Sequence, residues 1–247
     1  MSTIYILWLR QIKRYLRSKS RIVGSLGQPV LFLVALGFGL GPIFQRAGQG
    51  NYIQFLAPGI IAMSILFTSI FSGIEVIWDR QFGFLKETLV APVSRFSIML
   101  GRTLGGATVA TLQGVIILLI SLVVGFRPVL SGILPAFLIM LLIAILFTAL
   151  GTAIASRLED MQGFQLIMNF LVMPLFFLSG AFFPLPGLPK VLGIVVRFDP
   201  LTYGVDGIRG ALIGISHFGL PMDLMILSIL VLAVLGLGSW LFSKVQI

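Results

Sequence analysis

Four long stretches of the chain contain no Asp, Glu, Lys or Arg residue. They cover residues 103–126, 128–156, 161–189 and 224–243. Each is long enough to cross about 30 Å of hydrocarbon as a helix, which takes roughly 20 residues. With 58% hydrophobic residues, 10% charged residues and a mean hydropathy of +1.10, the chain lies outside the range of water-soluble globular domains. The sequence therefore predicts a membrane protein.

Two earlier segments also qualify as spans, one interrupted only by Gln28 and the other ending ahead of Glu75. The six predicted spans are approximately residues 22–44, 55–77, 100–126, 130–156, 162–183 and 221–243. A transmembrane barrel would need segments of about 10 residues with alternating polarity, and this pattern is missing. We therefore expect an all-α integral membrane protein, with residues 1–247 forming one transmembrane domain without an internal repeat.

The first 21 residues form an amphipathic pattern. Apolar and aromatic residues recur at helical spacing, and basic residues occupy the complementary positions. The apolar set is Ile4, Tyr5, Trp8, Ile12, Tyr15 and Leu16, and the basic set is Arg10, Lys13, Arg14 and Arg17. The pattern predicts an interfacial helix over residues 1–21, with its aromatic side at the acyl boundary and its basic side against anionic headgroups of membrane lipids. The alternative is a signal peptide, which the long amphipathic basic segment and the lack of a cleavage-type site disfavour.

Basic residues are distributed unevenly around the spans. If six spans alternate, twelve of the seventeen Lys and Arg residues lie on one side and five on the other. By the positive-inside rule, both termini are expected to be cytoplasmic. The formal net charge of +9 is then explained by membrane orientation, and we expect no nucleic-acid partner.

The predicted cytoplasmic loop of residues 79–97 reads DRQFGFLKETLVAPVSRFS. It opens with a charged pair, continues through Phe82, Phe84 and Leu85, and stops at Pro92, whose ring would clash with a continuing helix. One interpretation is a solvated connector. The other is a short amphipathic helix whose exposed apolar residues lie on lipid or in the groove of a partner.

The segment after the fifth predicted span begins with a cluster of three prolines, Pro184, Pro186 and Pro189. These residues end the span and remove backbone donors, which is tolerable where the chain meets water or is buried in protein. The Asp199-Pro200 pair predicts a turn, and Asp206 and Arg209 stand at i and i+3, where they could pair on a helix face. Residues 184–212 fit either an extracellular loop with a surface helix or a segment that re-enters the membrane.

Two of these stretches resemble a known family. FGFLKETLVAPVSRFSIMLGR is similar to the coupling segment of ABC-2 type permeases, the membrane subunits of ATP-driven exporters, and especially of the daunorubicin-resistance permease group. FLSGAFFPLPGLPKVLGIVVRFDPLTYGVDGIRG is similar to the family's segment around the end of span five. The two motifs, the amphipathic start and the six-span layout together cover nearly the whole chain.

The resemblance implies a fold, partners and site residues. Residues 184–212 would form a re-entrant helix pair that caps the translocation path from the extracellular side. Two permease copies, identical or homologous, would work with two ATP-binding subunits, which hold ATP and Mg, while this chain binds no cofactor itself. The location would be the cytoplasmic (inner) membrane of a prokaryote. The residues implied for contact with the ATPase are Arg80, Phe82, Phe84, Leu85, Lys86, Glu87 and Arg95, and those implied for the re-entrant segment are Pro184, Pro186, Asp199, Pro200, Tyr203, Asp206 and Arg209.

Candidates for the substrate path are fewer. Glu75, near the cytoplasmic end of the second predicted span, is the ionisable candidate, and it is either functional or paired with Arg80 or another neighbouring basic residue. The aromatic residues Phe176, Phe177, Phe182 and Phe183 line a path or face lipid. An amphipathic drug or lipid-like substrate fits the missing mid-depth charges better than a free anion, and a lipid-linked saccharide remains an alternative.

Several kinds of chemistry have no residues to carry them. The chain lacks the G-x-x-x-x-G-K-[ST] motif that cradles ATP phosphates, lacks H-E-x-x-H, and has no cysteine. His217 is the only histidine, and the sequence places no further metal-ligating residues beside it. We therefore expect a non-enzymatic subunit, with a proton-coupled secondary transporter or a non-transporting membrane anchor as alternatives. Gly105, Gly106, Gly151 and Ala155 are predicted to allow close helix packing.

Overall fold

The computed structural model describes residues 3–47, 50–90 and 93–243, and the side chains at positions 85, 86, 89 and 243 lie outside this description. The described part is all-helical and contains no strand. The first helices are α1 (Thr3–Arg17), α2 (Lys19–Arg46), α3 (Tyr52–Phe71), α4 (Ile74–Gln81), α5 (Phe84–Val90) and α6 (Arg95–Val124). A short 3-10 turn, η1 (Leu130–Gly132), is followed by α7 (Ile133–Ala155), α8 (Met161–Leu178), α9 (Lys190–Phe198), α10 (Pro200–Ile213) and α11 (Leu220–Ser243).

Six helical segments of the described chain are long and apolar enough to cross a membrane, as predicted. They are Lys19–Arg46, Tyr52–Gln81, Arg95–Val124, Leu130–Ala155, Met161–Leu178 and Leu220–Phe242. The second of these segments is interrupted at Ser72 and Gly73, where α3 ends and α4 begins. The predicted helix of residues 1–21 is also divided, because α1 ends at Arg17 and α2 begins at Lys19.

Local side chains fix several helix starts. Asn51 accepts a hydrogen bond from the backbone N–H of Ile53, and Asp160 accepts two from the first turn of α8. Such N-caps satisfy donors that have no partner within the helix. Gly125 and Gly214 end α6 and α10 in the left-handed conformation, which glycine adopts without steric cost. Pro92, predicted to end the cytoplasmic helix, lies outside the described residues, and α5 ends at Val90.

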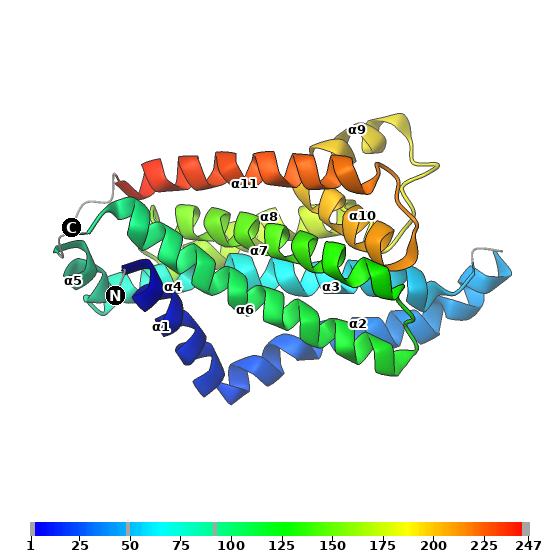
Figure 1. The fold of residues 1–247 in the computed structure, drawn as a ribbon, viewed down its shortest axis with the longest axis horizontal. Helices are drawn as coiled ribbons and strands as arrows, with labels where there is room; N and C mark the ends of the chain where they lie inside the picture. Colours follow the sequence, from blue (N-terminus) through cyan, green and yellow to red (C-terminus); the bar gives the residue numbers. More distant parts are fainter. Residues whose placement is uncertain (1–2, 48–49, 91–92, 244–247) are drawn as a thin grey trace.

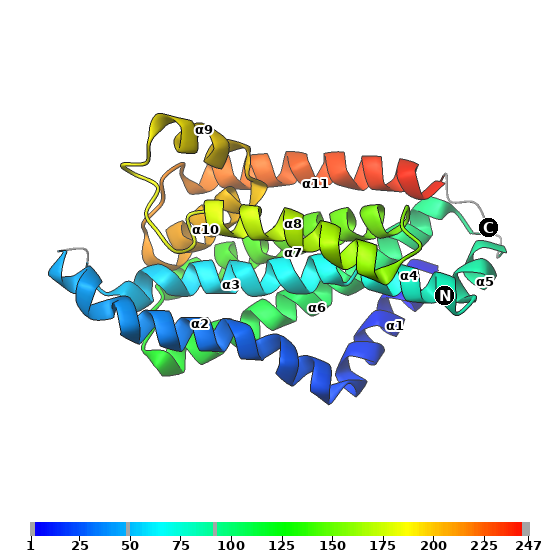
Figure 2. The same cartoon turned by 180° about the vertical axis from the view of Figure 1, so that it is seen from behind.

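Helix α3 forms the centre of the bundle. Its span is 72% buried, against 17% for the first and last spans, and it packs against α2, α6, α7, α8 and α10. The elongated bundle has two distinct ends (Figure 1). At the proximal end lie α4, α5, the start of α1 and the end of α11, and at the distal end lie α9 and α10. Seen from behind, α2 and α8 flank α3, and α11 lies at the opposite edge from α2 (Figure 2).

Glycines allow the central helices to approach closely, as the sequence predicted. A Cβ atom added to Gly151 of α7 would overlap the backbone carbonyl of Ile70 in α3. At Gly106 it would lie 2.7 Å from the side chain of Thr148, and at Gly105 2.6 Å from that of Gln11. These positions join α3, α6, α7 and α1 at distances that no larger residue permits without a shift.

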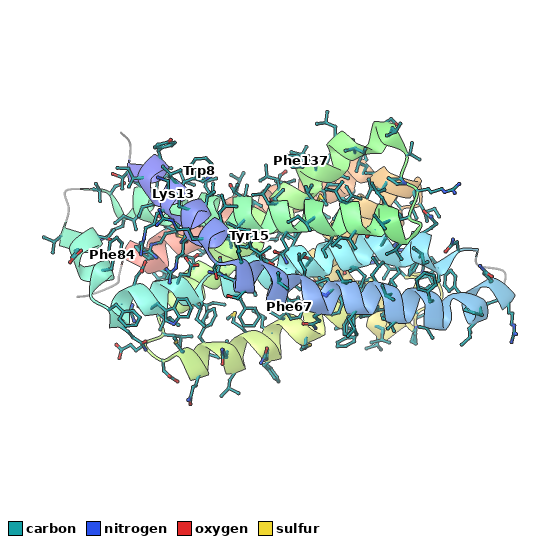
Figure 3. All side chains as sticks on the ribbon, turned by 90° about the horizontal axis from the view of Figure 1, so that it is seen from below. Trp8, Lys13, Tyr15, Phe67, Phe84 and Phe137 are labelled. Atoms are coloured by element: carbon teal, nitrogen blue, oxygen red, sulfur yellow. The ribbon has the colours of Figure 1, made fainter. Side chains whose placement is uncertain are left out.

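Helix α1 packs across α6, and its polar and aromatic side chains bind protein groups (Figure 3). The Trp8 indole donates to Thr108 at 3.0 Å, and the Tyr15 hydroxyl donates to Gln113 at 2.7 Å. Tyr15 is buried, although the sequence placed the aromatic side of this helix at the acyl boundary. The difference arises because small residues of α6, 80 to 100 positions away, provide a surface that hydropathy along one segment does not reveal.

Candidate functional site

A cluster of charged side chains joins four helices at the proximal end. Asp79 of α4 accepts hydrogen bonds from Arg10 of α1 at 2.7 and 3.1 Å and from Arg102 of α6 at 2.7 Å. Arg102 is 2% exposed, so its charge depends on Asp79 for compensation. Asp79 therefore fixes α1, α4 and α6 at one point.

Glu75, one turn earlier on α4, binds two further arginines. Its Oε1 lies 2.6 Å from Arg21 of α2, and its Oε2 lies 3.7 Å from Arg14 of α1. The sequence predicted that Glu75, if paired, would bind Arg80 or another neighbouring basic residue. The partners are other basic residues, Arg21 and Arg14, and pairing with Arg80 was wrong. Arg80 instead donates to the backbone carbonyls of Ser156 and Leu158 in the connection between α7 and α8.

The residues predicted to contact an ATPase lie around α5. Phe82 is 83% exposed, whereas the ring of Phe84 lies 3.8 Å from the guanidinium carbon of Arg10. Glu87 is exposed on α5, and Arg95 begins α6. The predicted side chains of Leu85 and Lys86 lie outside the described residues. Phe84 thus connects α5 to the Arg10–Asp79 pair.

An open groove of about 710 Å³ separates α1 from α4 and α5. Its lining combines basic side chains of α1 with aromatic side chains of both sides. The lining residues are Tyr5, Ile6, Leu9, Arg10, Lys13, Arg14, Arg17, Trp78, Asp79, Phe82 and Phe84. Lys13 and Phe84 are seen on this side of the bundle in Figure 3. Because Arg10 and Arg102 compensate Asp79, the groove presents a positive surface.

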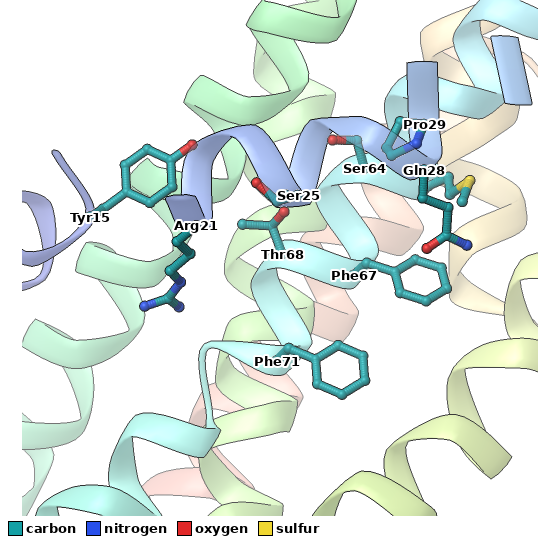
Figure 4. A pocket seen from close by; sticks show the side chains of 11 residues that line it. Tyr15, Arg21, Ser25, Gln28, Pro29, Ser64, Phe67, Thr68 and Phe71 are labelled. Atoms are coloured by element: carbon teal, nitrogen blue, oxygen red, sulfur yellow. The ribbon is translucent and has the colours of Figure 1, made fainter. Parts of the chain in front are cut away.

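A second pocket lies between α2 and α3, with a volume of about 240 Å³ (Figure 4). Polar side chains from both helices meet here, which is unusual inside membrane spans. They are Arg21, Ser25 and Gln28 of α2 and Ser64 and Thr68 of α3, with Tyr15 at one end. Phe67 and Phe71 complete the lining, so the pocket offers hydrogen-bonding groups beside aromatic rings.

Sequence reasoning missed this α2–α3 pocket. Gln28 was predicted only to interrupt a span, and Ser64 and Thr68 were not predicted to line a site. Each helix alone has weakly polar residues at i and i+3 or i+4, and such residues commonly bond to their own backbone. Ser64 has a buried hydroxyl without a hydrogen-bond partner among the described residues. Polar residues are visible in the sequence of both spans, but the pocket can be predicted only when it is known that α2 packs against α3.

Three of the four predicted path aromatics form one cluster. Phe176 is buried and lies 4.8 Å from Phe182 and 5.5 Å from Phe177 between ring centroids. Phe67 of the α2–α3 pocket also contacts Phe176, at 6.1 Å. Phe183 lines an open pocket of about 320 Å³ together with Phe182 of this cluster, Pro184, Tyr52 and residues of α2.

The segment of residues 184–212, which lies at the distal end, contains the helices α9 and α10. After Pro184 and Pro186, α9 and α10 meet at Asp199, whose side chain caps α10 by accepting from the Leu201 N–H at 2.8 Å. Pro200 occupies the first turn of α10, where its missing donor costs nothing. Burial raises the pKa of Asp199 to about 7, although the Leu201 hydrogen bond opposes the shift. Tyr203 ties the pair together by donating to the Arg197 carbonyl at 2.8 Å.

Asp206 and Arg209 do not pair with each other, contrary to the prediction from their spacing. Among the described residues, Asp206 accepts from the backbone N–H groups of His217 and Phe218. Arg209 donates to the carbonyls of Gly180 at 3.0 Å and Phe55 at 3.4 Å, and stacks on the Phe55 ring. Both residues are buried, and each binds backbone groups that helical spacing within α10 cannot reveal.

The six apolar helices define a multi-pass membrane protein, with a buried charged cluster that joins helices at one end. The family model for ABC-2 type transporters matches residues 2–213. The chain is 30% identical over 212 residues to nodulation protein J of Rhizobium leguminosarum bv. trifolii, covering 85% of this chain and 78% of that protein. It is 30% identical over 214 residues to a protein of Cyanophora paradoxa named "putative transport permease ycf38", covering 83% of this chain and 72% of that protein.

This chain belongs to the ABC-2 type transporter family. Nodulation protein J of Rhizobium meliloti (strain 1021) is similar to the same extent, with 30% identity over 203 residues, 81% of this chain and 77% of that protein. Transport permeases of this family generally work with an ATP-binding subunit.

Proposed function

We propose that this chain is the permease subunit of an ATP-driven exporter in the cytoplasmic membrane of a prokaryote, with both termini in the cytoplasm. The sequence has no P-loop, so ATP and Mg belong to a separate ATP-binding subunit, present in two copies. The observation that carries the proposal is the family match over residues 2–213. The proximal end then faces the cytoplasm and the distal end faces the outside.

The coupling surface comprises Phe82, Phe84 and the rest of α5, with Arg80 and Arg95 on either side. Phe82 supports this assignment because an 83% exposed phenylalanine beyond the end of a span needs lipid or a protein partner. A push on α5 would reach α1 through the Phe84–Arg10 contact and α6 through Asp79 and Arg102. Movement of the ATPase pair would thus be transmitted to α1 and to the second and third spans.

The coupling surface is tested by exchanging the charges of its central pair, Lys86→Glu with Glu87→Lys. In the complex with the ATP-binding subunit, we expect the exchange to lower nucleotide-stimulated ATPase activity about 10-fold, equivalent to about 1.4 kcal/mol of lost coupling. The matched control is Glu159→Gln, in an exposed position at the α7–α8 connection. Unchanged ATPase activity in the exchanged protein would remove this segment from the coupling surface.

The α2–α3 pocket is the proposed entrance of the substrate path. Gln28, Ser64 and Thr68 offer an amide and two hydroxyls, and Phe67 offers an aromatic wall that continues into the cluster around Phe176. This combination suits an amphipathic drug or lipid-like molecule, whose polar part needs hydrogen bonds inside hydrocarbon. The amide and hydroxyl groups also favour a second candidate, a lipid-linked saccharide. Glu75 has a proposed indirect role here, because its partner Arg21 lines the pocket.

A second permease copy is proposed to cover α8. This span is only 22% buried, and it exposes Gln162, Gln165 and Asn169 along one face. Polar side chains are costly against lipid and are commonly used for hydrogen bonds between membrane helices. Asn169 and Gln165 therefore support an interface with an identical or homologous permease.

Transport in inside-out vesicles tests the proposal against a proton-coupled carrier. We expect uptake of an amphipathic fluorescent substrate when ATP is supplied and the proton gradient is abolished by an ionophore. The double variant Ser64→Val with Thr68→Val should lower this uptake while leaving basal ATPase activity intact. Uptake that follows the proton gradient and ignores ATP would contradict an ATP-driven exporter.

A further inference from the structure

Asp223 is a buried carboxyl group that lacks a hydrogen-bond partner within the part of the chain that the structure describes. It is the fourth residue of α11, at the distal end where α11 lies beside α10 (Figure 1). Its exposed fraction is 0%, and neither of its carboxyl oxygens has a hydrogen-bond partner among the described residues. The side chain lies against Gly207 of α10, where an added Cβ would be 3.2 Å from its Cβ and 3.4 Å from its Oδ2.

Asp206, the residue before Gly207, has the opposite environment. It is also buried, at 2% exposure, but its two oxygens accept three contacts from backbone N–H groups. The His217 N–H lies 2.8 Å from both oxygens, and the Phe218 N–H lies 2.8 Å from Oδ2. Hydrogen bonds of this kind stabilise the ionised form of a carboxylate.

Among the residues of known placement, no Lys or Arg forms an ion pair with Asp223. Helix α7 has no charged or titratable residue between Ile133 and Ala155. On α6 the basic residues Arg95 and Arg102 lie in its first turns, at the proximal end.

From α10 the facing groups are Tyr203, Asp206 and Arg209. The Arg209 guanidinium is directed to the carbonyls of Gly180 and Phe55, and the exposed His217 contributes a backbone N–H to Asp206. An ionised carboxylate at Asp223 would be buried without a counterion, which is unfavourable, and it would lie near the carboxyl group of Asp206. The neutral acid avoids both costs.

We propose that Asp223 is a proton-binding site, which holds its proton while α10 and α11 are packed. The ligand is a single proton, because at 0% exposure the carboxyl has no contact with solvent in this conformation. The proton leaves when α10 and α11 separate and water reaches the carboxyl. Separation of α10 from α11 is therefore linked to release of one proton.

The consequence for transport rests on the proposed function, in which the distal end faces outside. Because the packed state binds one proton more than the open state, a higher external pH favours opening of the distal end. Export should therefore rise with external pH in a manner that depends on this carboxyl. Asp223→Asn imitates the neutral acid in every conformation and should abolish that dependence.

Infrared spectroscopy of the purified full chain in lipid at about pH 7 tests the site without any need for ATPase or substrate. We expect the wild type to show the carbonyl stretch of a protonated carboxyl that is absent from Asp223→Asn. The band should persist in Asp160→Asn, in which an exposed helix cap is changed. The difference between wild type and Asp223→Asn separates this group from Asp199, whose pKa is about 7.

A difference spectrum without this band would show that Asp223 is ionised and would overturn the inference. If Asp223→Asn does not fold, Asp223→Leu replaces it, because a neutral group should tolerate an apolar residue of similar size. Failure of both variants to fold would also count against a neutral Asp223.

The transport arm compares ATP-driven export at external pH of about 8 and about 6. The ratio should exceed one in the wild type and approach one in Asp223→Asn. A ratio equal in both proteins, with the infrared band present, would keep the proton site and reject its link to opening. A missing ATP dependence in both would reject the proposed function alone.

Discussion

Asp79 compensates two arginines that reach it from different helices. Arg102 is almost completely buried, whereas the Arg10 side chain is 32% exposed and also stacks on Phe84. An unpaired buried guanidinium is costly because it cannot regain its hydration. The stability of the proximal end therefore depends on the Asp79 carboxylate.

We predict that Asp79→Asn lowers the free energy of unfolding by about 3–5 kcal/mol, because it leaves the buried Arg102 without a counterion. Thermal unfolding of the purified protein in detergent measures the loss. Glu159→Gln removes an exposed carboxylate near the same end and should leave the melting temperature within about 1 °C of the wild type. Equal melting temperatures for Asp79→Asn and the wild type would contradict the assigned network.

Asp199 predicts a pH dependence of stability. Its pKa is raised to about 7 in the folded protein, so between pH about 4 and about 7 the folded state binds more protons than the unfolded state. Stability should fall as pH rises through this window, by an amount on the order of 4 kcal/mol at most. Asp199→Asn keeps a helix-capping side chain and should flatten that part of the profile. Identical melting profiles for both proteins would show that Asp199 is not shifted.

At this scale the sequence identified some of the charged residues that matter but not their partners. It singled out Glu75, Asp206 and Arg209 and proposed partners within one helical turn, whereas Asp79 and Asp223 were not predicted as site residues. The observed partners are distant: Arg21 precedes Glu75 by 54 positions, and His217 follows Asp206 by 11. Helical periodicity reports neighbours on one helix, whereas these contacts depend on which helices pack together.

Helix contacts in the bundle depend on positions without side chains. At Gly73 of the α3–α4 break and Gly151 of α7, the two backbones approach so closely that an added Cβ at either would meet the other helix. Hydropathy predicted the six spans, and the small residues within them predicted close helix packing. It did not predict the breaks at residue 18 and at residues 72–73, because neither contains a proline or a charge that hydropathy registers.

Two glycine substitutions separate packing from helix propensity. Gly151→Val should destabilise the protein by about 2 kcal/mol or more, because its side chain would overlap the backbone of α3. Gly39→Ala, on a part of α2 with no atom within 4 Å of the added Cβ, should be neutral or slightly stabilising. Melting temperatures of both variants in the same detergent provide the measurement. A tolerated Gly151→Val would mean that α3 and α7 are not in close contact.

The molecule as a whole has two ends with different chemistry. The proximal end carries arginines, two carboxylates of α4 and exposed aromatics, whereas the distal end carries buried aspartates and the α9–α10 pair. The family and the six spans could be predicted from the sequence, because motif order and hydropathy extend along the chain. The α2–α3 pocket could not, nor could the burial of Asp223 against α10 without a hydrogen-bond partner among the described residues, because both arise from contacts between separate helices.

Cysteine crosslinking tests the proposed second copy. The chain contains no cysteine, so Asn169→Cys introduces a single thiol on the exposed face of α8. We expect oxidation in native membranes to give a disulfide-linked dimer, and Ile229→Cys, on the exposed face of α11, to give none. A crosslink at position 229 without one at position 169 would place the second copy against α11.

The central claim is that this chain moves substrate with ATP hydrolysed by a separate subunit. The most direct measurement is purification of the tagged chain from its native membrane in mild detergent, followed by identification of its companions and an assay for vanadate-sensitive ATPase activity. The account predicts a soluble P-loop subunit in the complex and ATPase activity that vanadate inhibits. Recovery of the chain alone, without ATPase activity and with transport that follows a pH gradient, would contradict it.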